Sequence, residues 1–305
     1  MTLFPYTTLF RSRHLPATDP QARDLLLSCG AALHHLRVAL AATGWATTVH
    51  RLPNPTEPDH LAAVEYTPHP ASTEAIAMAG AITQRRTDRR RFSSWPVPEG
   101  LLDWLTHAAA EQGAILLPTT DPADRFQLAS AIAEAAVRQN ANPEYAAELR
   151  EWTGSGFGAV DGVPTANMPE DRSPGTCQTM SVPVRHGDTT MRAFPPGELA
   201  SFPDYGEEDA GELLLLGTSA DDPVSRLRAG EAMSAVLLRA TDCGLATCPL
   251  SQPLEIGHTR MLLEDRLFSS SACPQIVLRV GWAPPEHNVV PATHRRDVSD
   301  VLDRY

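Results

Sequence analysis

Lysine is absent from this 305-residue chain, so all 25 of its basic side chains are arginines. Usage this one-sided is typical of GC-rich coding sequence and indicates no function by itself. Acidic residues outnumber the arginines and give a formal net charge of −12, which argues against a nucleic-acid-binding protein. Long hydrophobic runs are missing too, because no unbroken apolar stretch reaches the roughly 20 residues that a membrane helix needs.

Cysteine is scarce, and its count of five is odd. Without a secretory signal, this count indicates reduced thiols and a cytoplasmic location. Cys243 and Cys248 have the wrong spacing for a zinc knuckle, and the 11 histidines form no ligand pattern, so we predict no metal site. Walker and G-x-G-x-x-G loops and a serine in a glycine elbow are also absent, and we assign no catalytic side chain.

What is present is a composition that suits a globular core, with 42% hydrophobic residues. Apolar residues at three- and four-residue intervals predict helices, and short apolar runs between turn residues predict strands. The predicted helices are 19–43, 72–86, 98–113, 122–139, 143–152, 221–243 and 254–267. The predicted strands are 45–52, 60–68, 114–120, 212–219, 245–250 and 274–284. This mixture predicts an α+β protein.

Two segments depart from this pattern. Residues 153–203 are rich in glycine, proline and polar residues, and we expect an ordered lid or arm there because apolar anchors punctuate the stretch. The first twelve residues, MTLFPYTTLFRS, have no period that continues into the chain and resemble a translated sequencing adapter. We expect residues 1–12 to be an artefact.

The chain contains an internal repeat with a constant offset of 200 residues. Gly30 matches Gly230, and the G-x-A-T segment that starts at Gly44 matches the one that starts at Gly244. Two helices that share an alanine-rich face would explain part of this match, but the matched segment after each helix favours a duplicated unit. Two related halves in one chain suggest a fused form of a dimer, and we expect a monomer.

The segment QRRTDRRRF places five arginines in seven positions, from Arg85 to Arg91. Their mutual repulsion favours a bound anion, since guanidinium groups and a threonine hydroxyl together suit phosphate. The residues alone leave two alternatives open, a solvated basic turn and a contact with RNA. The net charge disfavours the second.

Three segments resemble the nitroreductase family. RRTDRRRF after an alanine-rich helix is similar to the segment that opens the family's flavin mononucleotide (FMN) domain. RAGEAMSAVLLRATDCGLATCPLSQP resembles its second signature, and PQIVLRVGWAPPE with THRRDVSDVL resembles its last core strand and tail. The repeat, the RRTDRR form and the lid resemble the single-chain Acg subfamily. The resemblance implies two fused halves, 13–70 and 71–305, each with a mixed or antiparallel sheet flanked by helices.

The resemblance also implies which residues bind FMN. Its phosphate would be held by Arg85, Arg86, Thr87 and Arg89, with Arg295 or Arg296 from the tail. The additional arginine before Phe92 leaves the choice among Arg89, Arg90 and Arg91 open. The flavin ring would lie along Pro249, Leu250, Ser251 and Gln252, with a backbone N–H, that of Ser251, facing its N5 atom.

A family segment of the form A-P-S-x-H-N-x-Q-P-W, which contacts the ribityl chain and ring, has no counterpart here. It would lie where the adapter-like residues stand, so we expect this chain to bind FMN weakly or not at all.

The resemblance implies an oxidoreductase that passes hydride from NAD(P)H through FMN to a nitroaromatic or quinone-like acceptor. The alternative is an FMN storage protein whose lid blocks the nicotinamide, with little or no reductase activity. Either function has small molecules as its partners, without nucleic acid or membrane.

Overall fold

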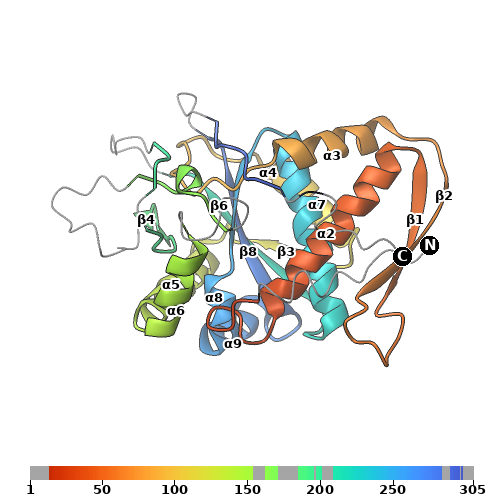
Figure 1. The fold of residues 1–305 in the computed structure, drawn as a ribbon. Coiled ribbons are helices and arrows are strands. Elements are labelled where there is room, and N and C mark those ends of the chain that lie inside the picture. The colour runs from red at the N-terminus through yellow and green to blue at the C-terminus, as the bar shows by residue number, and fades with distance from the viewer. Residues whose placement is uncertain are drawn as a thin grey trace.

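The computed structural model describes residues 14–153, 162–170, 185–195, 197–200, 209–283, 289–295 and 297. Its centre is a four-stranded antiparallel sheet in the order β3-β6-β8-β7 (Figure 1). The strands are β3 (Ile115–Pro118), β6 (Glu212–Thr218), β7 (Ala246–Leu250) and β8 (Cys273–Gly281). The expected α+β architecture with an antiparallel sheet is therefore present.

Helices cover both faces of this sheet. Leu214 and Leu216 of β6 face the core beneath α4 (Glu99–Ala110) and α7 (Pro223–Asp242). Leu213 and Leu215 face the core beneath α5 (Pro122–Asn140) and α9 (Gly257–Phe268). Because successive side chains of a strand point to opposite faces, a strand covered on both sides needs apolar residues at consecutive positions. This explains the four consecutive leucines of β6.

A second, smaller unit lies beside the α7 face. Helix α2 (Arg23–Ala42) packs along α7, and the hairpin of β1 (Trp45–Arg51) and β2 (Ala62–Pro68) pairs antiparallel next to it (Figure 1). Helix α3 (Thr73–Gln84) then returns across α2 and α7. By length and composition alone, α2 is the one helix in the described residues that could span a membrane, but in this fold it lies against α7.

The crossing of α2 and α7 is reciprocal. A Cβ atom placed on Gly30 would lie 2.0 Å from the Leu227 carbonyl oxygen, and one on Gly230 would lie 2.0 Å from the Leu27 carbonyl oxygen. His34 hydrogen-bonds Ser234 at 2.9 Å with the same offset of 200 residues. Contacts in which i meets j and j meets i are the mark of two-fold symmetry, so the sequence repeat corresponds to an internal pseudo-two-fold axis.

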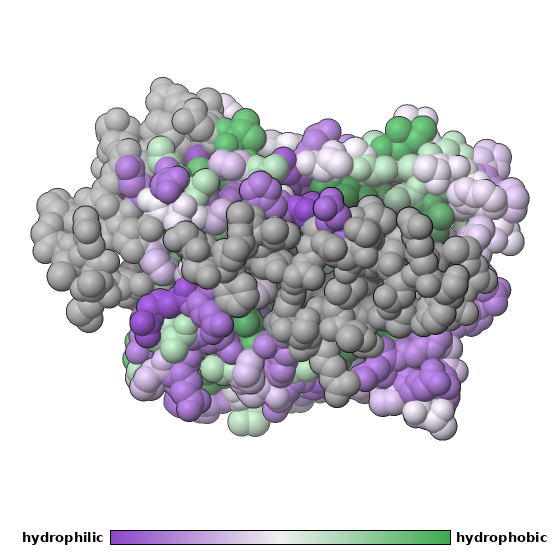
Figure 2. Space-filling model, viewed as in Figure 1, coloured by the Kyte–Doolittle hydropathy of each residue, from purple (hydrophilic) through white to green (hydrophobic). Residues whose placement is uncertain are grey.

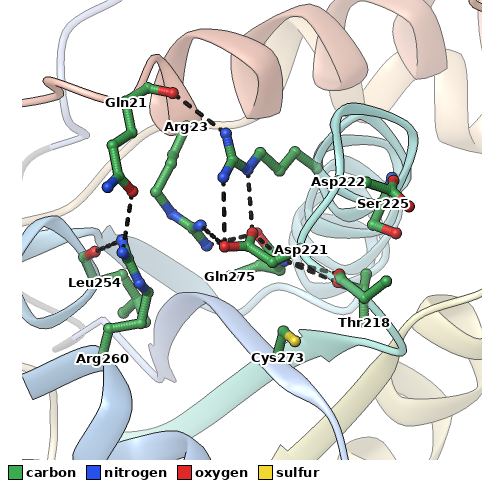
Figure 3. Close-up of polar contacts among 12 residues, drawn as sticks. Gln21, Arg23, Thr218, Asp221, Asp222, Ser225, Leu254, Arg260, Cys273 and Gln275 are labelled. Carbon is green, nitrogen blue, oxygen red and sulfur yellow. Dashed lines mark hydrogen bonds and ion pairs between the residues drawn. The ribbon is translucent and has the colours of Figure 1, made fainter. Parts of the chain in front are cut away.

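A polar junction fixes the start of α2. The Arg23 guanidinium, 3% exposed, pairs with Asp221 and donates to the Gln275 amide oxygen at 2.9 Å (Figure 3). Gln275 in turn donates to the Thr218 hydroxyl at 2.8 Å. The first turn of α2 is thereby tied to the turn between β6 and α7 and to β8.

Two further elements complete the part around the site. Helix α6 (Pro143–Trp152) follows α5, and the segment predicted as one helix over 254–267 divides into α8 (Gln252–Glu255) and α9. The described parts of the predicted lid contain one short antiparallel strand pair and one 3₁₀ turn. The strands are β4 (Arg185–His186) and β5 (Thr189–Thr190), and the turn is η2 (Thr165–Asn167). On the face shown in Figure 2, hydrophilic and hydrophobic residues are interspersed over the described surface.

Candidate functional site

The arginine-rich loop after α3 uses some of its arginines to hold itself together. Arg90, 2% exposed, binds the buried Asp88 carboxylate in bidentate fashion, with Nε–Oδ1 at 2.9 Å and Nη2–Oδ2 at 2.8 Å. From β8, the buried Arg279 pairs with Asp209 and lies 3.7 Å from the centre of the Phe92 ring. These two arginines are committed to ion pairs with buried carboxylates.

Four other arginines gather without such a partner. In the described part of the chain, no carboxylate pairs with Arg85, Arg86, Arg89 or Arg295. Burial lowers the pKa of Arg85, and the nearby charges of Arg295, Arg86 and Arg89 lower it further. The Arg86 Nε atom is buried and has no hydrogen-bond acceptor. A buried donor in an uncompensated positive cluster is costly, and this arrangement suits an anion.

The loop carries this cluster to the edge of the central sheet. Thr87 forms a parallel bridge with Thr247 of β7, and the Asp88 N–H donates to the Thr247 carbonyl oxygen at 2.9 Å. Arg85 donates to the Thr87 hydroxyl at 3.4 Å. The cluster therefore lies beside the start of β7, whose last residues, Pro249 and Leu250, lead through Ser251 into α8 at Gln252.

His35 of α2 belongs to the same cluster. Burial lowers the pKa of His35 to about 4, and the charges of Arg85 and Arg295 act in the same direction. The imidazole is consequently neutral at physiological pH and adds a polar group without adding charge. Sequence reasoning had considered His35 only as a metal ligand and had set it aside.

A cavity of about 210 Å³ lies where the loop meets β7. Arg89 lines one side of it, and Pro249, Leu250, Ser251 and Gln252 line another. The Gln252 side chain is 2% exposed, and its Oε1 atom is a buried acceptor without a donor. This volume is below the roughly 300–1,000 Å³ of ordinary small-molecule pockets, so a nucleotide-sized ligand has to extend beyond it, past Arg89.

The floor of the cavity is a network around Arg192. The Arg192 guanidinium pairs with the Glu255 carboxylate and donates to the Tyr145 hydroxyl at 2.6 Å and to the Ser251 hydroxyl at 3.2 Å. Ser251 donates to Glu255 at 2.6 Å. The other Glu255 oxygen accepts from the Gln139 amide. The network fixes Ser251 from both sides, and Glu255 offsets the charge of Arg192.

The segment before α2 covers the cavity. Both oxygens of Glu148 on α6 accept backbone hydrogen bonds, from Ala17 at 3.1 Å and from Thr18 at 2.7 Å. This clamp sets Leu15 and Thr18 in the cavity wall, beside Asp24 from the first turn of α2. Both halves of the repeat thus contribute to one cavity.

The structure brings together most of the residues that the sequence suggested. Arg85, Arg86, Thr87, Arg89 and Arg295 share one region, and 249–252 form the adjoining wall, whereas Arg296 and residues 1–12 lie outside the described residues. Of the predicted lid, Val163, Met191, Arg192 and Phe194 line the cavity, and much of the rest is not described.

Sequence reasoning missed Asp24, Tyr145, Arg192 and Glu255. Arg192 and Glu255 are 63 residues apart and carry no local motif, and Asp24 looked like an ordinary first-turn acid. No three His, Cys, Asp or Glu side chains in the described ranges group closely enough to hold a metal ion.

The fold and site define an α+β protein in which a basic cluster and a cavity lie between two related units. The chain is 40% identical over 296 residues to a Mycobacterium tuberculosis protein named "Putative NAD(P)H nitroreductase Rv3131", an alignment that covers 95% of this chain and 80% of that one. It is 36% identical over 299 residues to the M. tuberculosis protein named "Putative NAD(P)H nitroreductase acg", covering 96% and 85%. The chain belongs to this nitroreductase family and is similar to its Acg member.

Solved structures give more distant likenesses. The FMN-dependent nitroreductase NfnB from Mycobacterium smegmatis, in complex with NADPH, is 15% identical, with a TM-score of 0.48 over 76% of this chain and 99% of that one. A nitroreductase with bound FMN from Bacteroides fragilis is 11% identical, with a TM-score of 0.45 over 74% and 98%. No family model matches the chain.

Proposed function

We propose that this chain is an FMN-dependent oxidoreductase that transfers hydride from NAD(P)H to a nitroaromatic or quinone-like acceptor. One observation carries the proposal: four arginines that have no carboxylate partner among the described residues adjoin a cavity walled by residues 249–252. FMN offers the two matching parts, a phosphate and a planar ring with polar edges. The names of the relatives point to the same chemistry.

The residues present fit FMN. Arg85, Arg86 and Arg89, with the Thr87 hydroxyl, would hold the phosphate, and the buried Arg86 Nε atom would gain an acceptor. Arg295 or Arg296 would add a tail contact. The unpaired Gln252 oxygen would accept from a ring N–H, and the Ser251 backbone N–H would donate to the ring.

When bound, FMN supplies the hydride chemistry itself, so the chain needs no nucleophile or metal for that step. The chain would orient the bound ligand, exclude water from the cavity and determine the charge of its surroundings. Leu15, Trp152 and Met191 give the cavity apolar walls. Because Glu255 offsets Arg192, Arg89 is the cavity-lining cation without a carboxylate partner among the described residues, and it favours negative charge on a reduced ligand.

The first experiment is the visible spectrum of the desalted chain after incubation with FMN, beside that of Arg85→Ala and Arg89→Ala. We expect weak FMN binding by the parent chain, measured by titration, and a dissociation constant at least ten-fold higher in either variant, because a hydrogen bond to a charged group contributes about 1.5–3 kcal/mol. Arg266→Ala, at an exposed position outside the site, is the matched control. Equal affinity in all four chains would contradict the assignment of the phosphate site.

Turnover separates the proposed oxidoreductase from the storage protein. A chain that binds FMN and reduces a quinone with NADPH is the oxidoreductase, and one that binds FMN without turnover is the store. Replacing residues 1–12 by the corresponding segment of a relative tests the expected weakness of FMN binding. We place the protein in the cytoplasm and expect a monomer, since the two related units already supply each other's interface.

A further inference from the structure

Two carboxyl groups and the Arg192 guanidinium line the cavity together with residues 249–252. Asp24 lines the cavity from the first turn of α2, and Glu255 lines it from the end of α8. Arg192 lies between the elements that carry them and forms its ion pair with Glu255. Arg192 is therefore paired with Glu255, and no ion pair of Asp24 with a guanidinium is found among the described residues.

The surroundings of Asp24 disfavour its charge from several sides. Asp19 lies on the segment before α2, and its two oxygens accept the backbone N–H groups of Arg23 at 2.7 Å and Leu25 at 3.0 Å, so the free donors of the helix start are occupied. Glu255 faces Asp24 from α8, and Glu148 lies on α6 beneath the covering segment. Arg192 and the Ser251 hydroxyl oppose these acids, and Arg89 also lines the cavity.

Burial is the largest influence and, with the charges of Glu255 and Asp19, raises the pKa of Asp24 to about 7. Burial also raises the pKa of Asp19. Interacting carboxyl groups influence one another's titration, and the raised pKa of Asp24 lets this side chain hold a proton near neutral pH. Glu255 forms its ion pair with Arg192, whereas no guanidinium in the described part of the chain pairs with Asp24.

We propose that Asp24 is the proton donor to the acceptor that is reduced in this cavity, an inference that rests on the proposed function. Reduction of a quinone consumes one hydride, which originates from the nicotinamide, and one proton. The O–H bond of the Asp24 carboxyl breaks, an O–H bond forms at the acceptor oxygen, and the electron pair stays on Asp24 as carboxylate. Water then reprotonates Asp24, so two electrons and two protons balance the hydroquinone.

Nothing else in the cavity is as well suited to this task. Burial raises the pKa of Tyr145 far above neutrality, and its hydroxyl already accepts from Arg192. Burial likewise raises the pKa of Cys248, which lines the cavity. Among the described residues that line the cavity, Asp24 is the acid that can both hold and release a proton near pH 7.

The first test uses the flavin-free chain and needs no turnover. The free energy of unfolding is measured in urea from pH 4 to pH 8.5 for the parent chain and Asp24→Asn. The native state holds a proton that the unfolded state releases above pH 3.8, so stability from this group is lost as pH rises toward 7. We expect the parent to lose stability relative to Asp24→Asn across this range. Parallel curves would overturn the proposal.

The second test uses the FMN-loaded chain and p-benzoquinone. We expect quinone reduction by the parent to decline above pH 7, and Asp24→Asn to be about 100-fold slower at pH 6 with no such decline, because general acid catalysis contributes about 10²–10⁴-fold. Asp24→Glu should recover part of the rate and the pH dependence. Asp103→Asn, at an exposed acid on α4, should match the parent.

The outcomes separate the two proposals. Flavin bands with unchanged rate and pH profile in Asp24→Asn would overturn the role of Asp24 and leave the oxidoreductase in place. Absence of FMN binding both in the parent chain and in the chain with residues 1–12 replaced would overturn the proposed function and the proton transfer with it. A slow Asp24→Asn that binds FMN as tightly as the parent and has lost the decline above pH 7 supports proton donation.

Discussion

At the scale of single residues, the arginine-rich loop divides its charges between two tasks. Arg90 neutralises Asp88 inside the protein, whereas Arg89, one position earlier, lines the cavity and stacks 4.9 Å from the centre of the Phe194 ring. Alternation along an extended backbone sends neighbouring side chains to opposite sides. The sequence could not decide among Arg89, Arg90 and Arg91, because the ion pair that occupies Arg90 depends on burial and not on composition.

Replacing Arg89 or Arg90 by alanine should therefore have different consequences. Arg90→Ala leaves the buried Asp88 carboxylate without its partner, which costs about 3–5 kcal/mol of folding free energy. Arg89→Ala should leave the melting temperature nearly unchanged and weaken FMN binding. Thermal unfolding and a flavin fluorescence titration measure the two effects. The reverse pattern, a stable Arg90→Ala and an unfolded Arg89→Ala, would show that the tasks are assigned wrongly.

His35 makes a second residue-scale prediction. Burial, together with the charges of Arg85 and Arg295, keeps His35 neutral in the free chain, with a pKa of about 4. A bound phosphate offsets those charges and raises the pKa of His35 toward its ordinary 6.5, so binding near pH 5.5 should take up a proton.

Calorimetric titrations with FMN in buffers of different ionisation enthalpy measure that uptake. His35→Gln should lose it, and riboflavin, which lacks the phosphate, should show no uptake that depends on His35. Equal proton uptake by the parent chain and His35→Gln would remove the histidine from the site.

At the scale of elements, the position of the site depends on how closely α2 approaches α7. The Gly30 and Gly230 backbones pack without side chains between them, and the buried Glu231 accepts from Arg37 at 2.6 Å and from Arg51 Nε at 2.6 Å. This contact sets Asp24 and the covering segment against the wall formed by 249–252.

Gly30→Ala should consequently destabilise the fold. The added methyl would lie 2.0 Å from the Leu227 carbonyl oxygen, and relieving that overlap has to separate two backbones at a cost of roughly 1–3 kcal/mol or more. Gly80→Ala is the matched helical control, since its nearest atom would be 3.9 Å away and alanine favours the helix by up to about 1 kcal/mol. Chemical denaturation of both variants checks this, and a stable Gly30→Ala would contradict the crossing.

Elements were the level at which the sequence was most informative. The predicted helix over 72–86 has Ser72 as its N-cap, whose hydroxyl accepts from the Ala75 N–H at 3.1 Å. The predicted helix over 19–43 ends before Gly44, whose φ of +92° explains why glycine stands there. The break at Ile256 between α8 and α9 was missed, because the apolar period runs across it. The Arg192–Glu255 pair was also missed, since contacts between distant elements leave no periodic signal.

At the scale of the whole molecule, the two copies of the helix–glycine–strand repeat have different surroundings. Gly244, with φ of +80°, repeats the role of Gly44, yet only the later unit continues into a four-stranded sheet. The first unit contributes α2 and a hairpin, and its residues Asp24 and His35 complete the cavity and the cluster. The two units therefore have different places in the structure, since the later one supplies the central sheet and the first supplies residues that close the site.

This assembly buries histidines in their neutral form, which predicts sensitivity to acid. Burial lowers the pKa of His34 to about 3 and those of His35 and His186 to about 4, with nearby arginines acting in the same direction. Below pH 6.5 the three histidines bind protons in the unfolded chain but not in the native structure. The free energy of unfolding therefore falls as the pH decreases from 6.5 toward 4. Each histidine contributes up to about 1.4 kcal/mol per pH unit.

Asp24 acts in the opposite direction over this range, with one proton held by the native state. Asp19, whose pKa burial also raises, acts in the same direction as Asp24. The large shifts of the three histidines still leave a net loss of stability on acidification, which urea unfolding between pH 4.5 and pH 7 measures. His34→Gln should flatten the decline by about one proton, whereas His107→Gln, at an exposed position on α4, should follow the parent curve. A parent chain equally stable at pH 4.5 and pH 7 would mean that these histidines are not buried as neutral groups.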